Sequence, residues 1–166
     1  MKNRIYSFLI FFYFFSFSLS AQHSLPTEEI VKLLPDYLKG FQQTEAPISK
    51  LIRVGGIQYS LCDKRFSKGN QRIKFLLFDF KEAPIMYSQA TKKWSSAIPI
   101  VTDSVVQRPF VIENCSGWET ANYKMGSSQI FLGIYDRFFL TIEGENVEQE
   151  RLKLLLQEVD FRKFQN

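Results

Sequence analysis

The chain has 166 residues, with 21 basic and 17 acidic side chains, one histidine and two cysteines. A net charge of +4 without a long basic tract argues against a nucleic-acid partner, which requires a strongly basic surface. One histidine, His23 near the N-terminus, and two cysteines are too few for a zinc site or a Cys-His catalytic centre. We therefore predict no metal and no cofactor.

Residues 1–21 predict a secretory signal peptide. Two basic residues are followed by an apolar run from Ile5 to Leu19, and small residues lead to Ala21, which is the order of a cleavable export signal. The apolar run is shorter than the roughly 20 residues that span a bilayer, so we expect cleavage after Ala21 and no membrane anchor afterwards. The mature protein would be periplasmic or secreted. It would carry 19 basic and 17 acidic residues.

The first predicted helix is short. Thr27 followed by two glutamates is typical of an N-cap and first turn. Apolar residues then recur at helical spacing, at Ile30, Leu33 and Leu34, and Pro35 ends the helix.

A β-hairpin is predicted next. Residues 56–66 and 71–80 resemble strands, and Gly69-Asn70 between them suits a tight turn. The second strand is apolar on both faces, which predicts a position inside the sheet with cover on both sides. One face carries Ile73, Phe75 and Leu77, and the other carries Leu76, Phe78 and Phe80.

Two further helices frame the second half. Pro84 suits the first turn of a helix in which Met86, Ala90 and Trp94 recur every four residues. After a connection over residues 98–107, four strand-like runs predict an antiparallel meander, with turns at Gly117, Gly126 and Asp136-Arg137. The last helix has Asn146 and Gln149 in a capping-box spacing and an apolar stripe of Leu152, Leu155, Leu156 and Val159.

These elements predict one α+β domain over residues 22–166, with a mainly antiparallel sheet of about six to seven strands flanked by helices. The C-terminal helix should pack on the sheet. No repeat, linker or low-complexity tract divides the chain.

Three blocks, "RFSKGNQRIKFLLFDFKEAPIMYSQA", "GWETANYKM" and "DRFFLTIEGENVEQERLKLLLQEVDFRK", resemble uncharacterised small exported proteins of Gram-negative bacteria. The resemblance covers most of the mature chain and implies export, with no activity, cofactor or catalytic residue attached to it. The order of elements is also similar to the Mog1/PsbP-like fold, which accessory and binding proteins use. A shared fold alone does not imply a function.

Carboxylates are the main reactive side chains, at Asp79, Glu82, Glu113, Glu119, Glu143 and Glu145. A pair across a cleft could hydrolyse glycosides. Their positions at strand ends and before the last helix favour structural roles instead. We therefore expect Glu143→Gln and Glu119→Gln each to leave the fold and any biological activity largely intact.

Aromatic residues give the best prediction of a binding site. Trp94, Trp118, Tyr123 and Tyr135 could line an apolar pocket with polar tips, or they could pack in the core. Arg137 could bind an anionic ligand, or it could be a solvated or paired charge.

Cys62 and Cys115 are the two cysteines. Export to an oxidising compartment favours a disulfide between them, and buried free thiols are the alternative. A bridge requires Cα atoms about 4.4–6.8 Å apart, and the sequence does not supply that distance.

The sequence as a whole favours an exported, non-enzymatic binding or accessory module whose partner is a protein or a small apolar ligand. The alternative is a small carboxylate-based hydrolase. An aromatic pocket without converging acids would favour the first, and two converging acids with raised pKa values would favour the second.

Overall fold

The computed structural model describes residues 23–165 and shows an α+β fold built on one nine-stranded sheet. Every strand pairing in the sheet is antiparallel. The predicted signal peptide, residues 1–21, lies outside the described residues. The fold class is confirmed, and the number of strands is larger than the six to seven predicted.

The first half contains α1 (Thr27–Lys32), β1 (Gln42–Gln43), β2 (Ile48–Val54), β3 (Ile57–Lys68) and β4 (Gln71–Asp79). The second half contains α2 (Pro84–Lys92), the short 3-10 helix η1 (Lys93–Ser95), β5 (Ile100–Val101), β6 (Val105–Ile112), β7 (Cys115–Asn122), β8 (Ser127–Ile134), β9 (Phe138–Glu145), α3 (Gln149–Leu156) and the 3-10 helix η2 (Phe161–Gln165).

The meander closes back on the early hairpin. The strand order is β1-β3-β4-β9-β8-β7-β6-β5, and β2 pairs with the same edge of β3 as β1 does. Strand β9 therefore lies beside β4, although about 60 residues separate them in sequence. This pairing joins the two halves of the chain into a single sheet.

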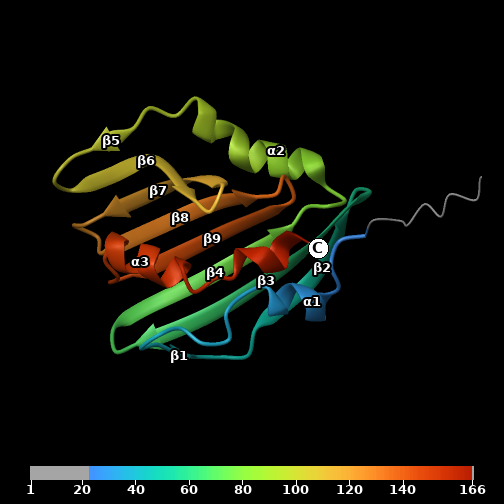
Figure 1. The fold of residues 1–166 in the computed structure, drawn as a ribbon, viewed down its shortest axis with the longest axis horizontal. Helices are drawn as coiled ribbons and strands as arrows, with labels where there is room; N and C mark the ends of the chain where they lie inside the picture. The colour runs from blue at the N-terminus through green and yellow to red at the C-terminus, as the bar shows by residue number, and fades with distance from the viewer. Residues whose placement is uncertain (1–22, 166) are drawn as a thin grey trace, which may run out of the picture.

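One face of the sheet, which we call the covered face, lies under α1, α3 and the C-terminal segment (Figure 1). The apolar stripes that the sequence predicted are buried here, on α1 and α3 and on the residues that directly follow each helix: Ile30, Leu33, Leu34, Leu152, Leu155, Leu156 and Val159. Alternate residues of the strands meet them, among them Phe66, Phe75, Leu77, Phe138, Leu140, Ile142, Ile130 and Leu132. The predicted docking of the C-terminal helix is confirmed, because α3 contacts β8 and β9.

Buried ions also hold the covered face together. The Lys64 ammonium on β3, almost inaccessible to solvent, donates to the backbone oxygens of Leu34 and Pro35 and pairs with Asp36 at 2.7 Å. It thereby satisfies carbonyl groups just after α1, where a helix leaves its last acceptors unpaired. A buried lysine with three partners ties α1 to the sheet.

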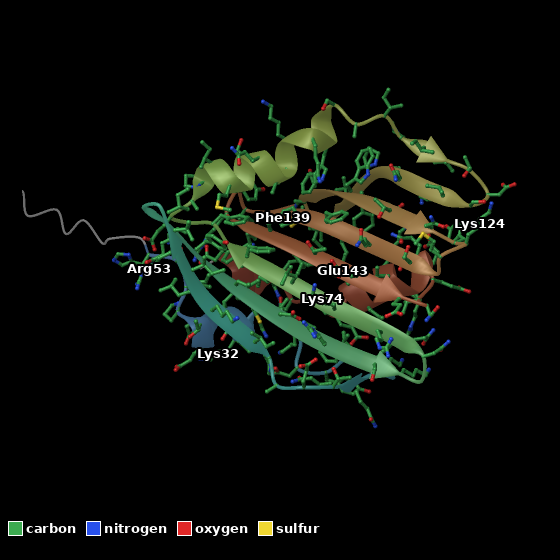
Figure 2. The ribbon with its side chains drawn as sticks, turned by 180° about the vertical axis from the view of Figure 1, so that it is seen from behind. Lys32, Arg53, Lys74, Lys124, Phe139 and Glu143 are labelled. Atoms are coloured by element: carbon green, nitrogen blue, oxygen red, sulfur yellow. The ribbon has the colours of Figure 1, made fainter. Side chains whose placement is uncertain are left out.

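On the other face, which we call the open face, α2 and η1 along one margin are the only helical segments within residues 23–165 (Figure 2). Cover on both sides of β4 was therefore a wrong prediction. Ile73, Phe75 and Leu77 are fully buried, whereas Leu76 and Phe78 on the other face remain partly exposed. Strand β4 is interior within the sheet, yet one of its faces still meets solvent.

Local signals failed at several boundaries. Helix α1 begins at Thr27 itself, without a side-chain cap, and α3 has Glu148 rather than Asn146 at its N-cap position. Asn146 instead adopts a left-handed conformation with φ 55° and donates to Asn70. Gly117 lies inside β7, and the turn before that strand is Glu113-Asn114. The prediction did not resolve β1, β2 and β5 as separate strands; all three are edge strands with mostly exposed side chains.

Cys62 and Cys115 are not bonded to each other, which corrects the predicted disulfide. Cys62 lies on β3 and Cys115 on β7, and three strands lie between them. At about 4.8 Å per strand spacing, the two lie on the order of 19 Å apart, far beyond the reach of a disulfide. Both thiols are buried, and burial raises the pKa of Cys62 to about 11. They belong to the core as small apolar residues.

Candidate functional site: the open face of the sheet

The open face changes character along its strands. Near the β3–β4 hairpin, adjacent strands align charged and polar side chains in one row: Arg65, Lys74, Glu143, Gln129, Thr120 and Gln107. Two residues further along the strands, the row is Asp63, Leu76, Thr141, Phe131, Trp118 and Pro109. Beside α2 the row is Leu61, Phe78, Phe139, Gly133, Ser116 and Val111. The face is thus polar at the hairpin end and apolar beside α2.

Six rings at the apolar end form a continuous series that we call the aromatic band: Tyr59, Phe80, Phe78, Phe139, Phe131 and Trp94. Neighbouring ring centres are 5.4–6.4 Å apart, within the range of favourable aromatic contacts. Phe80 is buried, and the other five are only partly buried. A solvent-facing side of an antiparallel sheet is normally polar, so this band departs from the expected alternation.

A pocket of about 440 Å³ opens where the band meets the ends of the strands, and we call it the Trp94 pocket. It is lined by Tyr87, Thr91, Trp94, Asn114, Ser116, Gly133, Tyr135 and Asp136. Two features shape it. The Trp94 indole stacks on Phe139 with ring centres 5.9 Å apart, and its buried N–H has no hydrogen-bond partner among the described residues.

Turn geometry and one glycine complete this pocket. Asn114, Tyr135 and Asp136 all have positive φ values, of 65°, 50° and 51°. This region suits asparagine and aspartate but is costly for a bulky tyrosine. Gly133 leaves space for the Tyr87 hydroxyl, because a Cβ at position 133 would lie 2.5 Å from that oxygen. Burial raises the pKa of Tyr87 to about 12, and the charge of the nearby Asp136 carboxylate adds to the rise.

A second pocket, of about 540 Å³, lies at the hairpin end of the face. Its charged residues form cross-strand or neighbouring pairs: Lys74 with Glu143 at 3.4 Å, Arg72 with Glu145 at 3.2 Å, and Arg65 with Glu45 at 3.2 Å. Figure 2 shows Lys74 and Glu143 side by side on the open face. Each glutamate here lies beside a cation, so the pocket does not bring two unpaired carboxylates together.

The structure brings together only two of the five binding residues predicted from the sequence. Trp94 and Tyr135 share the Trp94 pocket. Tyr123 lies at a different pocket, of about 390 Å³, next to the start of α3. Trp118 lies on the open face but is buried, in agreement with core packing rather than ligand contact.

Arg137 is the fifth predicted residue, and it is a structural charge. Its guanidinium makes a bidentate ion pair with the fully buried Asp79, with Nε–Oδ1 at 2.8 Å and Nη2–Oδ2 at 2.7 Å. Asp79 also accepts from the backbone N–H of Leu25 and of Lys81. Asp79 thereby anchors the N-terminal segment through Leu25 and engages the guanidinium of Arg137 in an ion pair.

Glu119 is buried on the covered face, although the sequence suggested a strand-end position. It accepts from Arg108, from Lys153 at 3.0 Å and from Gln149 at 3.0 Å. Burial raises the pKa of the Glu119 carboxyl, but these hydrogen bonds outweigh burial, and its pKa is lowered overall. Because Glu119 joins α3 to the sheet, we now expect its replacement to reduce stability.

Glu82, like Glu119, has a lowered pKa, whereas a catalytic acid needs a raised one. Hydrogen bonds, above all from the backbone N–H of Ser24, outweigh burial and lower its pKa. Within residues 23–165, no three His, Cys, Asp or Glu side chains gather closely enough to hold a metal ion. In the same range, no helix is long and apolar enough to cross a membrane.

Sequence reasoning missed most of the site. Phe139 and Phe131 were placed in strands but not recognised as surface residues, and Tyr87 was not singled out. The signal that could have found Phe131 and Phe139 is the sequence of β8 and β9, in which both faces of each strand carry apolar residues. Comparisons with known proteins give no match to a protein family, a curated protein or a solved structure. The resemblances drawn from the sequence therefore stay predictions.

Proposed function

We propose that the protein is an exported, non-enzymatic binding module that holds a small amphiphilic molecule on the open face of its sheet. The observation that carries this proposal is the aromatic band, in which five of the six rings stay partly exposed beside α2. Contiguous apolar surface of this kind on a single chain marks a binding region more often than a structural one. The export signal predicted from residues 1–21 supports a role outside the cytoplasm.

Polar groups adjoin the aromatic band on both sides, in the Trp94 pocket and toward the hairpin end, and they support an amphiphile over a purely apolar ligand. The apolar part of such a molecule would contact the rings, and its polar part would contact hydrogen-bonding groups beside them. The alternative, a carboxylate hydrolase, lacks support, because a general acid needs a raised pKa. Glu82 and Glu119 have lowered pKa values, and Glu143 and Glu145 lie beside cations.

Binding of the neutral fluorescent dye N-phenyl-1-naphthylamine tests the proposal. We expect the folded protein to bind the dye, and we expect Phe131→Gln and Leu76→Gln each to weaken binding at least tenfold. Both side chains are only partly buried, so both variants should fold, which thermal unfolding checks. Leu154→Gln is the matched control, since Leu154 is exposed on α3 behind the sheet.

Dye that binds the two open-face variants and the control with equal affinity would contradict the proposal. A second measurement uses protein recovered from its native host. Extraction of the denatured protein, followed by mass spectrometry, should release an amphiphilic molecule from the wild type and little or none from the Phe131→Gln variant.

A further inference from the structure

The Trp94 pocket has an unusual composition for a site next to an aromatic surface. Seven of its eight lining residues carry hydrogen-bonding side chains, and Gly133 is the exception. One of them, Asp136, is acidic, and none is basic. An anionic group placed here would face a carboxylate with no cation in the lining. The pocket therefore favours a neutral group over an anion.

Two polar groups define what that neutral group must do. The Trp94 N–H is a buried donor with no partner in the described part of the chain, and a buried unpaired donor is costly. The Asp136 carboxylate lies near Tyr87 in the same lining, and a carboxylate has lone pairs that accept from donors. A hydroxyl group can accept from the indole and donate to the carboxylate. A cation cannot accept, so it would leave the Trp94 donor unpaired.

Tyr135 also belongs to the lining of the pocket. It is about half exposed and lies in the left-handed region, where a tyrosine is strained. Its hydroxyl accepts from Gln165 Nε2 at 2.8 Å, which links it to the C-terminal segment. Strained residues held in place by their surroundings concentrate at ligand sites. A sugar ring matches this arrangement, because its C–H face packs on an aromatic ring while its hydroxyls point to the polar rim.

We propose that the Trp94 pocket binds the neutral sugar head of an amphiphile whose apolar part lies on the aromatic band. The proposal rests on the function proposed above and names the head group of the ligand. The stacking of Trp94 on Phe139 makes the pocket and the band continuous. A volume of about 440 Å³ is within the range of small-molecule sites.

Octyl glucoside, octyl sulfate and octylphosphocholine, each below its micelle concentration, test this assignment by calorimetric titration. The three share one tail and differ in the head group. We expect octyl glucoside to bind at least tenfold more tightly than octyl sulfate. Trp94→Phe keeps a ring but removes the N–H, and it should lower this ratio of affinities at least fivefold. A ratio cancels any loss that affects both probes equally.

Tyr135→Asn gives a second variant, because asparagine tolerates the left-handed conformation. It should also lower the glucoside-to-sulfate ratio. Tyr123→Asn is the matched control, since Tyr123 is similarly exposed in another turn and should leave the ratio unchanged.

The outcomes separate the two proposals. If none of the octyl probes and no N-phenyl-1-naphthylamine binds, the proposed function itself fails, and this inference fails with it. If the probes bind without preference for glucoside, or the ratio does not respond to Trp94→Phe and Tyr135→Asn, only the sugar assignment is overturned.

Two further outcomes would assign a different head group. Preference for octyl sulfate or octylphosphocholine that Lys74→Met abolishes would place the head at the hairpin end instead. N-octylacetamide binding as tightly as octyl glucoside would assign the pocket to an amide, and it would also overturn the sugar.

Discussion

The two faces of the sheet are formed by the same strands but differ in how far they bury their charged and apolar side chains. On the covered face, Lys64, Asp79 and Glu119 are buried, and each has several hydrogen-bond partners. On the open face, Lys74 and Glu143 are partly exposed, and their ion pair is screened by solvent. Apolar side chains follow a similar division, because those of the covered face are buried, whereas most of those on the open face are partly exposed, apart from Trp118 and Phe80. The covered face stabilises the fold, which leaves the open face available for binding.

The strongest test of this contrast is the removal of a buried charge from the covered face. Asp79→Ala would leave Arg137 without its carboxylate and the Leu25 N–H without an acceptor. Breaking a buried pair on one side typically costs about 3–5 kcal/mol. Chemical denaturation should show a loss of that order, while the exposed control Asp103→Ala should change little. A loss below about 1 kcal/mol for Asp79→Ala would contradict the structural role of this ion pair.

Adjacent leucines of β4 compare the two faces directly. Leu77 is fully buried on the covered face, and Leu76 is partly exposed on the open face. Leu77→Ala should cost about 2–5 kcal/mol in the free energy of unfolding, because it removes a buried side chain and leaves a cavity. Leu76→Ala should cost clearly less, and the same denaturation experiment measures both. Equal losses would show that the open face is covered in solution.

Acid should weaken the covered face through Glu119. Its pKa is lowered in the folded protein from the ordinary value near 4.5, so its contribution to stability is complete above that value. The contribution is then lost as the pH falls through the lower folded pKa. Glu119→Gln should lower stability at pH 7 and reduce the dependence of stability on pH below about 4.5. Parallel stability curves for the variant and the wild type at pH 2–7 would contradict this prediction.

The smallest effect is expected at the open-face pair. Glu143→Gln removes one charge from a partly exposed cross-strand pair, and such pairs contribute at most about 1 kcal/mol. Thermal unfolding should therefore change little, and Lys74→Met is the matched partner variant. Loss of a hydrolytic activity in Glu143→Gln, with the fold intact, would favour the hydrolase alternative over the binding module.

Local sequence signals were sufficient for the elements whose residues pack in one clear direction. The stripe of Leu152, Leu155 and Leu156 predicted a helix on the sheet, and it is buried there. The Gly69-Asn70 turn and the order of the four meander strands were also predictable, because turn residues and strand alternation act over a few neighbours. Caps were less predictable, since Asn146 and Gln149 bond to Asn70 and Glu119, which are distant in sequence.

The candidate site depended on the tertiary structure, because its parts come from segments far apart in the chain. The pairing of β4 with β9 brings Phe78 beside Phe139, and α2 then places Trp94 on that ring. The same strand order separates Cys62 from Cys115 and gives Arg137 to Asp79 rather than to its neighbour Asp136. A sequence pattern shows that a strand is apolar on both sides. Which side of the sheet remains exposed depends on where the helices pack, and that is a property of the tertiary structure. Here α1, α3 and η2 pack on one face, whereas α2 and η1 reach only the margin of the other.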